Sequence, residues 1–448
     1  MRREVYRHLE KLLDEKNMVE LHDELVNLHE VEAATFINRL SPVEAAIVFR
    51  LLPKTEAVGV FSYLDGDSQE NLLEGFTDEE VNQVVSELAA DDAVDMLEEM
   101  PAIVVSRVLK VVKPEKRDML NTYLRYPEDS AGRLMNPDYL KLKQTQTVGE
   151  ALKFINETAD DSQILDTFYV TDNTRILEGV VSLKTLVLSD DKSLIRDVMD
   201  TDFIYVDTDV DQEDVVHIFR DYDLLTLPVV DGEKRLLGFI TVDDAFDAMQ
   251  EETTEDFEKM AGMAPSERPY LKTSVFKHAK SRVTWLLVLM ISGIVNGLIL
   301  GNFEHAFVAM PILVTFIPML TDTGGNAGSQ SSTMIIRGMA LNELDIRNLG
   351  AIIWKELRVS ILVGLVLALV NFLRIYIMHP DMALVALVVS LAMICIIVLA
   401  KLLGSILPLI AKVLGLDPAI MAAPLITTIV DAVGLIVYFL VAEAILGI

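Results

Sequence analysis

The chain divides near residue 270 into two halves that differ in charge and in hydropathy. Residues 1–270 carry 27 Lys and Arg against 59 Asp and Glu, whereas residues 271–448 carry 11 against 9. The first half therefore has an excess of 32 negative charges, while the second is nearly neutral and consists of long apolar runs. A chain of 448 residues has room for several domains, each with its own core. This division predicts an acidic water-soluble part joined to a membrane part.

The acidity of the first half limits its ligands and points to cations. The acidity disfavours nucleic acid and anionic membrane surfaces as its partners, because their phosphates would be repelled. Plain solubility is the alternative explanation for the excess acid. The single cysteine, Cys395, lies in an apolar run, so we expect neither a disulfide framework nor a Cys-based metal site. The charged N-terminal segment lacks the apolar region and cleavage site of a signal peptide.

Five apolar segments of the second half are long enough to cross a bilayer. They are residues 283–303, 306–336, 359–378, 382–407 and 419–447. The second and fifth contain Pro and Gly, so we expect them to be tilted or broken. Ten basic residues fall at one side of these spans: Lys272, Lys277, Lys280, Arg282, Arg337, Arg347, Lys355, Arg358, Lys401 and Lys412. Only Arg374 falls at the other side, which predicts a cytosolic acidic half and an external C-terminus.

Two carboxylates lie inside the predicted spans. Asp431 is near the middle of the fifth span with no Lys or Arg close in sequence, and such a residue marks an ion or proton pathway unless it is a hydrogen-bonded structural Asp. Asp322 precedes a glycine-rich stretch in the second span. That stretch supplies Gly325, Asn326 and Gln330 as candidates to line a wet path, although close helix packing would also explain its glycines.

An internal repeat occupies residues 130–250. Residues 169–172 align with 228–231, and 179–182 with 238–241, at an offset of 59. Each copy reads as helix, strand, strand, helix. This pattern resembles a tandem pair of CBS domains, whose Gly-x-x-Thr/Ser-x-x-Asp ending often holds an adenosine nucleotide. Only the second copy has that ending, with Thr241 and Asp244 as the nucleotide candidates.

Short amphipathic helices are predicted throughout residues 1–130. The segments SPVEAAIVFRLL, KTEAVGVFSYL, TDEEVNQVVSEL and ADDAVDMLEEM each open with an expected N-cap and an acidic first turn. Their recurrence predicts an all-α helical-repeat domain.

A further helix is predicted over residues 243–262, between the repeat and the membrane part. Its acidic side chains Asp244, Asp247, Glu251, Glu255 and Glu258 recur at three- and four-residue steps and share one face. Like charges at that spacing repel, and divalent cations bridging them to another acidic surface would offset the repulsion. A solvated linker helix is the alternative interpretation.

The order of these parts resembles the MgtE family of magnesium channels over essentially the whole chain. The motifs that carry the resemblance are TGGNAGSQ at 323–330, EDFEKMAG at 255–262, and LDPA followed by PLITTIVDAVG. The resemblance implies a homodimer in the bacterial inner membrane, with a pore on the two-fold axis in which Asp431 faces hydrated Mg²⁺. It also implies ATP at the CBS pair and cytosolic Mg²⁺ sites at Asp91, Asp95, Glu213, Asp223, Asp244, Asp247, Glu252, Glu255, Asp256 and Asp417. Gly59 departs from the family, which places an acid there.

The expected architecture is therefore multidomain, with an all-α N-domain, an α/β CBS pair and a five-span helical membrane domain. Its divisions are 1–130, CBS-like copies at 131–198 and 199–250, the connecting helix and linker at 251–282, and the membrane domain at 283–448. Oxygen-only candidate sites favour Mg²⁺ or Ca²⁺ over Zn²⁺. We expect Mg²⁺ uptake that cytosolic Mg²⁺ shuts off. The alternatives are a broader Co²⁺ or Mn²⁺ transporter and a nucleotide-regulated protein with a membrane anchor, while the lack of catalytic motifs disfavours an enzyme.

Overall fold

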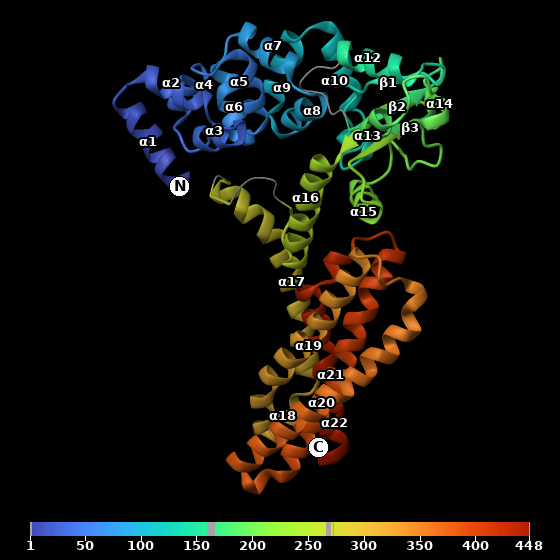
Figure 1. The fold of residues 1–448 in the computed structure, drawn as a ribbon. Coiled ribbons are helices and arrows are strands. Elements are labelled where there is room, and N and C mark those ends of the chain that lie inside the picture. Colours follow the sequence, from blue (N-terminus) through green and yellow to red (C-terminus); the bar gives the residue numbers. More distant parts are fainter. Residues whose placement is uncertain (1, 159–165, 266–269, 272, 448) are drawn as a thin grey trace. The chain divides into compact units, whose positions relative to one another are not determined.

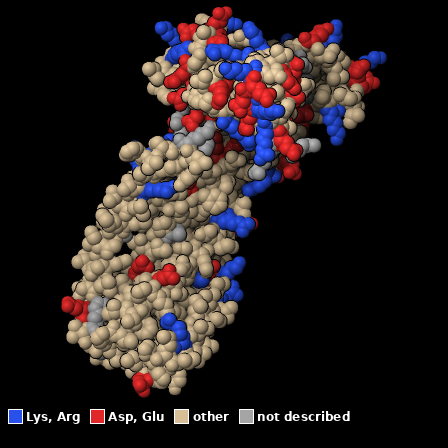
Figure 2. Space-filling view, turned by 90° about the vertical axis from the view of Figure 1, so that its left-hand side faces the viewer, with Lys and Arg blue, Asp and Glu red and all other residues tan. Residues whose placement is uncertain are grey.

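The computed structural model describes residues 2–158, 166–265, 270–271 and 273–447. The chain folds as two compact units, Met1–Met249 and Gln250–Ile448 (Figure 1). Charged side chains are dense on the face of the first unit seen in Figure 2, whereas the face of the second is mostly uncharged with scattered charged side chains. The division predicted from charge thus matches the division into units to within about twenty residues.

The N-terminal region of the first unit consists of short helices. They are α1 Arg2–Asp14, α2 Met18–Val26, α3 Glu30–Ile37, α4 Pro42–Phe49, α5 Lys54–Ser62, α6 Gly66–Gly75, α7 Asp78–Glu87, α8 Ala90–Glu99, α9 Ala102–Val111 and α10 Pro114–Tyr123. Helices two apart in sequence pack together, α3 on α5, α5 on α7 and α7 on α9. This stacking confirms the predicted helical-repeat arrangement.

The predicted N-caps are confirmed for two of the four segments. Ser41 and Thr77 form capping boxes before α4 and α7, each with the Glu three residues later. The N-caps of α5 and α8 are Pro53 and Ala89, which make no side-chain cap bond. The expectation was wrong there because neither side chain carries a hydrogen-bond acceptor.

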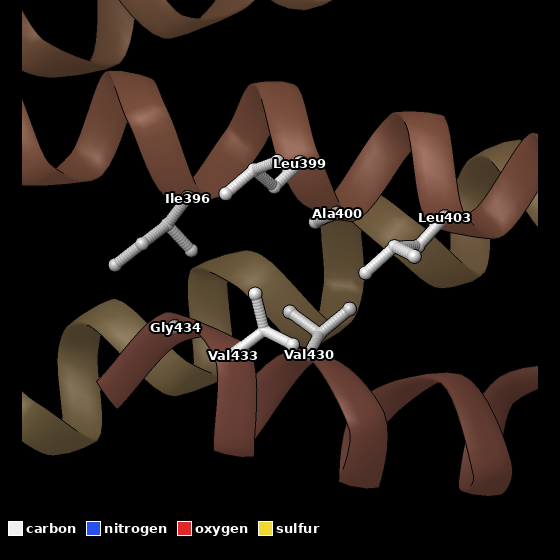
Figure 3. A pocket seen from close by; sticks show the side chains of 7 residues that line it. All are labelled: Ile396, Leu399, Ala400, Leu403, Val430, Val433 and Gly434. Atoms are coloured by element: carbon white, nitrogen blue, oxygen red, sulfur yellow. The ribbon is translucent and has the colours of Figure 1, made fainter. Parts of the chain in front are cut away.

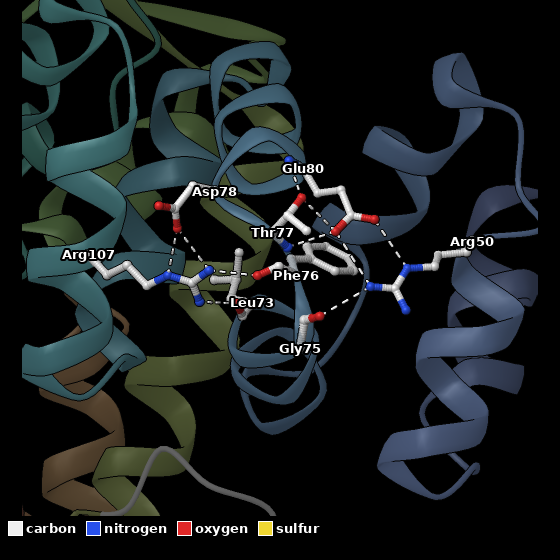
Figure 4. A network of polar contacts seen from close by, with 8 residues as sticks. All are labelled: Arg50, Leu73, Gly75, Phe76, Thr77, Asp78, Glu80 and Arg107. Carbon is white, nitrogen blue, oxygen red and sulfur yellow. Dashed lines mark hydrogen bonds and ion pairs between the residues drawn. The ribbon is translucent and has the colours of Figure 1, made fainter.

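Two arginines join α6 to α7 (Figure 4). Arg107 of α9 donates to the carbonyls of Leu73 and Phe76, at 2.7 and 2.6 Å. Its Nε and Nη2 both donate to Asp78 Oδ1, at 3.2 and 3.1 Å. Arg50 of α4 makes the corresponding contacts with Gly75 and Glu80. Each guanidinium therefore satisfies carbonyls at the end of one helix and a carboxylate at the start of the next.

The repeat forms two three-stranded sheets of the same topology. The first contains β1 Lys141–Leu142, β2 Thr167–Thr171 and β3 Leu177–Ser182, with α12 Val148–Thr158 and α13 Leu183–Leu188; the second contains β4 Val206–Asp207, β5 Thr226–Val230 and β6 Leu236–Thr241, with α15 Gln212–Tyr222. Short helices α11 Ala131–Leu134 and α14 Ile195–Val198 precede them. In each sheet the first strand pairs parallel to the second, which pairs antiparallel to the third. The two-residue strands β1 and β4 were not predicted, because a strand that short has no readable alternation.

Helix α16, Val242–Met260, begins directly after β6 and spans the boundary between the two units. The predicted helix over residues 243–262 is confirmed to within two residues at each end.

The second unit is helical. Its elements are α17 Val275–Asn302, α18 Glu304–Ala309, η1 Pro311–Phe316, α19 Ile317–Ala340, η2 Ile346–Asn348, α20 Leu349–Met378, η3 Pro380–Met382, α21 Ala383–Val413, η4 Pro418–Met421 and α22 Ala423–Leu446. Within the described residues, four segments are long and apolar enough to cross a membrane: Val275–Asn302, Ile346–Met378, Pro380–Val413 and Pro418–Leu446. These segments indicate a membrane protein. The fifth span stays a prediction, because α19 is long enough at 24 residues but too polar to count as a membrane segment.

The second predicted span is broken, as expected, into α18, η1 and α19. Several basic residues assigned to connections lie elsewhere. Lys355 and Arg358 belong to α20, because that helix begins before the apolar run from which the third span was read. Lys401 was counted with the connection to the fifth span, but it lies inside α21 and within the fourth predicted span. Lys272 lies outside the described residues.

Helix α21 is the centre of the second unit and contacts α19, α20 and α22. An apolar hollow between α21 and α22 is shown in Figure 3, lined by Ile396, Leu399, Ala400, Leu403, Val430, Val433 and Gly434. Its lining offers no polar side chain to replace the water of a hydrated cation, so the hollow is a packing feature of the membrane unit.

Candidate functional site

A stripe of polar side chains runs along one face of α19. Asp322, Asn326 and Gln330 follow one another at four-residue steps, and all three are exposed in the single chain. Thr333 and Arg337 continue the stripe toward the end of the helix. An exposed polar stripe on a helix buried among apolar helices is costly in lipid, so this face is expected to line water or a partner.

Asp431 adds a second carboxylate to this region. It lies half-buried in α22, which packs against α19, and its charge interacts with that of Asp322. The structure therefore brings together the two intramembrane carboxylates that the sequence singled out. Two like charges in an apolar unit need a cation, water or a proton nearby.

The glycine-rich stretch is a regular part of α19. Gly325 is buried, and a Cβ built on it would lie 2.9 Å from the side chain of Thr427 in α22. Gly325 thus lies on the side of α19 that packs against α22, where a larger side chain would require Thr427 to move, and its role in lining a wet path stays a prediction. Asn326 and Gln330 present their amides on the exposed face.

A second cluster of carboxylates lies where α8 meets the start of α16. Asp91 is 7% exposed and accepts a hydrogen bond from Asn136 Nδ2 at 3.2 Å. Burial, reinforced by the charge of Asp92, raises the pKa of Asp91. Burial and the charge of Asp91 likewise raise the pKa of Asp244. Burial is the main cause at both carboxyl groups, and neighbouring aspartate charges add to it, so this cluster would be stabilised by a cation.

The remaining predicted sensor residues of the first unit lie at several different places. Asp247 is exposed on the next turn of α16, and burial and the charge of Asp243 raise its pKa. Asp95 lies near Arg133, which forms an ion pair with Glu98. The other two predicted residues are exposed: Glu213 lies in the first turn of α15, and Asp223 is the C-cap of that helix.

The nucleotide candidates Thr241 and Asp244 bond to each other. Thr241 Oγ1 donates to Asp244 Oδ2 at 2.5 Å across the first turn of α16. Asp244 thus belongs both to this turn and to the cluster with Asp91. A ligand that binds Asp244 would act on both.

The space beside Gly59 is occupied by another acid. A Cβ built on Gly59 would lie 2.3 Å from Glu30 Oε1, so the Glu30 carboxylate lies where a side chain at position 59 would begin. The charges of Glu30, Asp92, Asp243 and Asp247 all act on Tyr63. Glu30 was missed by sequence reasoning because it lies 29 residues from Gly59 and in a different helix.

In the second unit, Lys259 of α16 joins two predicted metal ligands. Its Nζ lies 2.6 Å from Glu255 and 2.7 Å from Asp417, the N-cap of η4. Burial acts to lower the pKa of Lys259, but the hydrogen bonds to Asp417 and Glu255 outweigh it and raise the pKa. The lysine therefore supplies a positive charge between these carboxylates. Glu252 and Asp256 lie half-buried on the same helix.

No group of three or more His, Cys, Asp or Glu side chains converges as a metal site within the described residues. Two pairs of predicted carboxylates interact, Asp322 with Asp431 and Asp91 with Asp244, and Mg²⁺ accepts such sites because it retains several of its waters. These pairs fit a hydrated divalent cation by their chemistry, since every candidate donor is an oxygen.

The molecule combines an acidic helical domain, a CBS pair and a membrane unit with polar and carboxylate groups on its inner helices. This combination is typical of one class, the cation transport proteins of the membrane. Family models agree with this assignment. The model described as divalent cation transporter, MgtE, matches residues 317–441, the MgtE intracellular N domain matches 28–129, and the CBS domain matches 131–190 and 195–251.

The chain belongs to the MgtE family. It is 34% identical over 443 residues to the magnesium transporter MgtE of Thermus thermophilus, covering 98% of each chain. It is also 30% identical to the MgtE of Bacillus subtilis, covering 91% of this chain and 92% of that relative.

Solved structures match rather more than half of the chain. The soluble part of a magnesium transporter is 28% identical, with a TM-score of 0.53, and the match covers 56% of this chain and 99% of that one. The cytosolic domain of the Mg²⁺ channel MgtE, solved in complex with ATP, is 33% identical with a TM-score of 0.51, and that match covers 54% and 99%.

Proposed function

We propose that the protein is a Mg²⁺-selective channel for magnesium uptake that closes when cytosolic Mg²⁺ binds its acidic domains. The observation that carries this proposal is the pairing of Asp322 and Asp431 beside the exposed polar stripe of α19. The relatives are magnesium transporters, which supports the same ion.

The pore is proposed to form between two copies of the chain. In one copy the stripe with Asp322, Asn326 and Gln330 is exposed, and a second copy related by a two-fold axis would cover it. Asp431 from each copy would then face a hydrated Mg²⁺. Lipid surrounds the outer faces of α17, α20 and α21, and α19 serves as the fifth span despite its polarity.

The orientation follows from basic residues that remain at helix ends. Arg347, Lys412 and Lys277 lie at or near the ends that connect α19 to α20, α21 to α22, and the linker to α17. By the positive-inside tendency, these ends and the N-terminus are cytoplasmic and the C-terminus is outside, in a bacterial inner membrane. The five divisions at 1–130, 131–198, 199–250, 251–282 and 283–448 belong to this proposal.

Closure is proposed to depend on charge. When divalent cations are scarce, Asp91 and Asp244 repel each other and weaken the contact between α8 and α16. When cations are plentiful, that repulsion is neutralised and the acidic domains hold the connecting helix so that it closes the pore. The coupling is a difference in Mg²⁺ affinity between two states. The sensor set is Asp91, Asp95, Glu213, Asp223, Asp244, Asp247, Glu252, Glu255, Asp256 and Asp417.

Glu30 is proposed to supply the acid that Gly59 lacks, since its carboxylate occupies the adjoining space. ATP is proposed to bind the second CBS copy through Thr241 and Asp244, and an ATP complex of a relative's cytosolic domain supports this. Because Asp244 also faces Asp91, nucleotide and Mg²⁺ would affect one another.

Mg²⁺ flux into liposomes tests the pore. Asp431→Ala should abolish the flux while the protein remains folded, because the substitution removes the pore carboxylate. Asp381→Ala is the matched control, an exposed Asp in η3 outside the proposed path, and should leave flux unchanged. Near-normal flux through Asp431→Ala would reject the pore assignment.

A broader divalent transporter is the first alternative, and substitution of Co²⁺ or Mn²⁺ in the same assay separates it. A nucleotide-regulated protein that uses its membrane unit only as an anchor is the second, and it would carry no flux at all. The carboxylates and amides on α19 and α22 favour transport over anchoring, and they favour transport over an enzyme activity as well.

A further inference from the structure

Lys401 is buried in the interior of the membrane unit. It lies inside α21, is 5% exposed, and its Nζ donates to Ser331 Oγ of α19 at 3.2 Å. Ser331 Oγ in turn donates to Glu356 Oε2 of α20 at 2.7 Å. A lysine charge in an apolar interior is costly, so its partners are expected to matter.

Both hydrogen bonds of Ser331 have a defined direction. A serine hydroxyl has one donor and can accept, so Ser331 accepts from the ammonium and donates to the carboxylate. Bonds that involve an ionised group are stronger than those between neutral groups. The hydroxyl therefore links Lys401 and Glu356 across three helices, and we call these three residues the charge relay.

The charge relay adjoins the closest approach of two helices. A Cβ built on Gly404 of α21 would lie 2.2 Å from the carbonyl oxygen of Gly328 in α19. Gly328 and Gly404 each lie three residues, or about one turn, from Ser331 and Lys401 respectively. Next to Ser331, Ser332 Oγ donates to the carbonyl of Met421 at 2.7 Å. One side of α19 is thus fixed by a backbone contact and by directed hydrogen bonds.

The polar stripe lies on the opposite side of the same helix. Ser331 is nine residues from Asp322, and at about 100° per residue the two point in roughly opposite directions. Ser331 is buried, whereas Asp322, Asn326 and Gln330 are exposed. Any rotation of α19 that breaks the relay would therefore turn the stripe away from its present direction.

We propose that Lys401, Ser331 and Glu356 are positioning residues, which fix the rotation of α19 so that its polar stripe faces the ion path. This inference rests on the proposed function in identifying what the stripe faces. The relay acts through α19 and does not contact the ion.

Thiol accessibility tests the rotation without any need for transport. Cys395→Ser gives a background without native cysteine, and Asn326→Cys then places one thiol on the stripe. A water-soluble thiol reagent should modify it readily. Adding Lys401→Met should slow modification by about tenfold, since coupled buried groups contribute on that scale. Lys401→Arg should restore the rate, and Lys412→Met, an exposed lysine of the same helix, should not change it.

A double-substitution cycle tests the link between the two charges. Lys401→Met leaves the Glu356 charge without its partner, so adding Glu356→Gln should recover part of the lost thermal stability and accessibility. If Lys401→Met gives no folded protein, Glu356→Gln alone provides the accessibility measurement. An unchanged modification rate in either variant, or strictly additive stability losses, would overturn the relay. Absence of Mg²⁺ flux in the unsubstituted protein would reject the proposed function and leave these two results standing.

Discussion

A carboxylate buried beside another carboxylate requires a proton or a cation to offset its charge, and this applies to Asp91 and Asp244. Burial raises both pKa values from 3.8 to about 7, helped by the charge of Asp92 at Asp91 and by the charge of Asp91 at Asp244. The folded state therefore binds protons more readily than the unfolded chain does. The stability that these two carboxyl groups contribute by being protonated in the folded state is complete below about pH 4, and it is lost as the pH rises through about 7.

The first prediction follows from that sign. In chelator, the unfolding temperature of the first unit within the full chain should fall by a few degrees between pH 5.5 and pH 8, and Mg²⁺ should restore it at pH 8. Circular dichroism in detergent measures this. Asp244→Asn should flatten the pH dependence. A profile that rises with pH, or that is the same for Asp244→Asn, would contradict the assignment.

The second prediction concerns Glu30, whose carboxylate adjoins Gly59. Glu30→Ala should raise by about tenfold the Mg²⁺ concentration that is needed to stabilise the first unit. The reason is that the substitution removes one acid from the proposed Mg²⁺-binding surface. Glu24→Ala, an exposed acid of α2, is the control and should behave as the unsubstituted protein. Equal Mg²⁺ requirements in both variants would show that Glu30 has no part in binding.

At the scale of elements, the third prediction concerns the crossing of α19 and α21. Gly404→Ala would place a methyl group 2.2 Å from the carbonyl of Gly328, so the two backbones must separate. The unfolding temperature of the membrane unit should fall, by an amount that reflects about 1–3 kcal/mol of overpacking. Gly293→Ala in α17 meets no atom within 4 Å and should be neutral or slightly stabilising. Similar unfolding temperatures for the two variants would contradict the close crossing.

The fourth prediction concerns the joint between α6 and α7. Arg107→Met removes the hydrogen bonds to Leu73 and Phe76 and the pair with Asp78, which should destabilise the N-terminal helices by about 1–3 kcal/mol. Lys110→Met, an exposed lysine of the same helix, is the control. Urea unfolding followed by circular dichroism separates them, and equal midpoints would show that the arginine is dispensable.

Element type was predictable where a period or a repeat was long. The helix over 243–262 and the paired strands of the repeat follow from local pattern, whereas β1 and β4 have only two residues each and owe their existence to tertiary pairing. Helix ends in the membrane unit were harder to predict. Lys355 falls between the second and third apolar runs and looks like a loop residue in a hydropathy reading, but it lies inside α20. Lys401 falls within the fourth run, and its hydrogen bond to Ser331 depends on how α21 packs against α19.

At the scale of the whole molecule, the division of charge predicted the two kinds of unit, and the order of motifs predicted the family. Residues that act through space were not predictable. Glu30 beside Gly59, Lys259 between Glu255 and Asp417, and Glu356 beyond Ser331 join positions far apart in sequence. Nothing in local composition indicates such neighbours, because they depend on how separate helices pack.

The central claim is that cytosolic Mg²⁺ closes a Mg²⁺ pore through the acidic domains. Single-channel recording in planar bilayers, with Mg²⁺ as the charge carrier, tests it directly. Open probability should fall as Mg²⁺ rises on the side of the N-terminus. Asp244→Asn combined with Asp247→Asn should still conduct but should close poorly at the same Mg²⁺ concentration. A current that is insensitive to Mg²⁺ on that side, or equal closure in the double variant, would contradict the account.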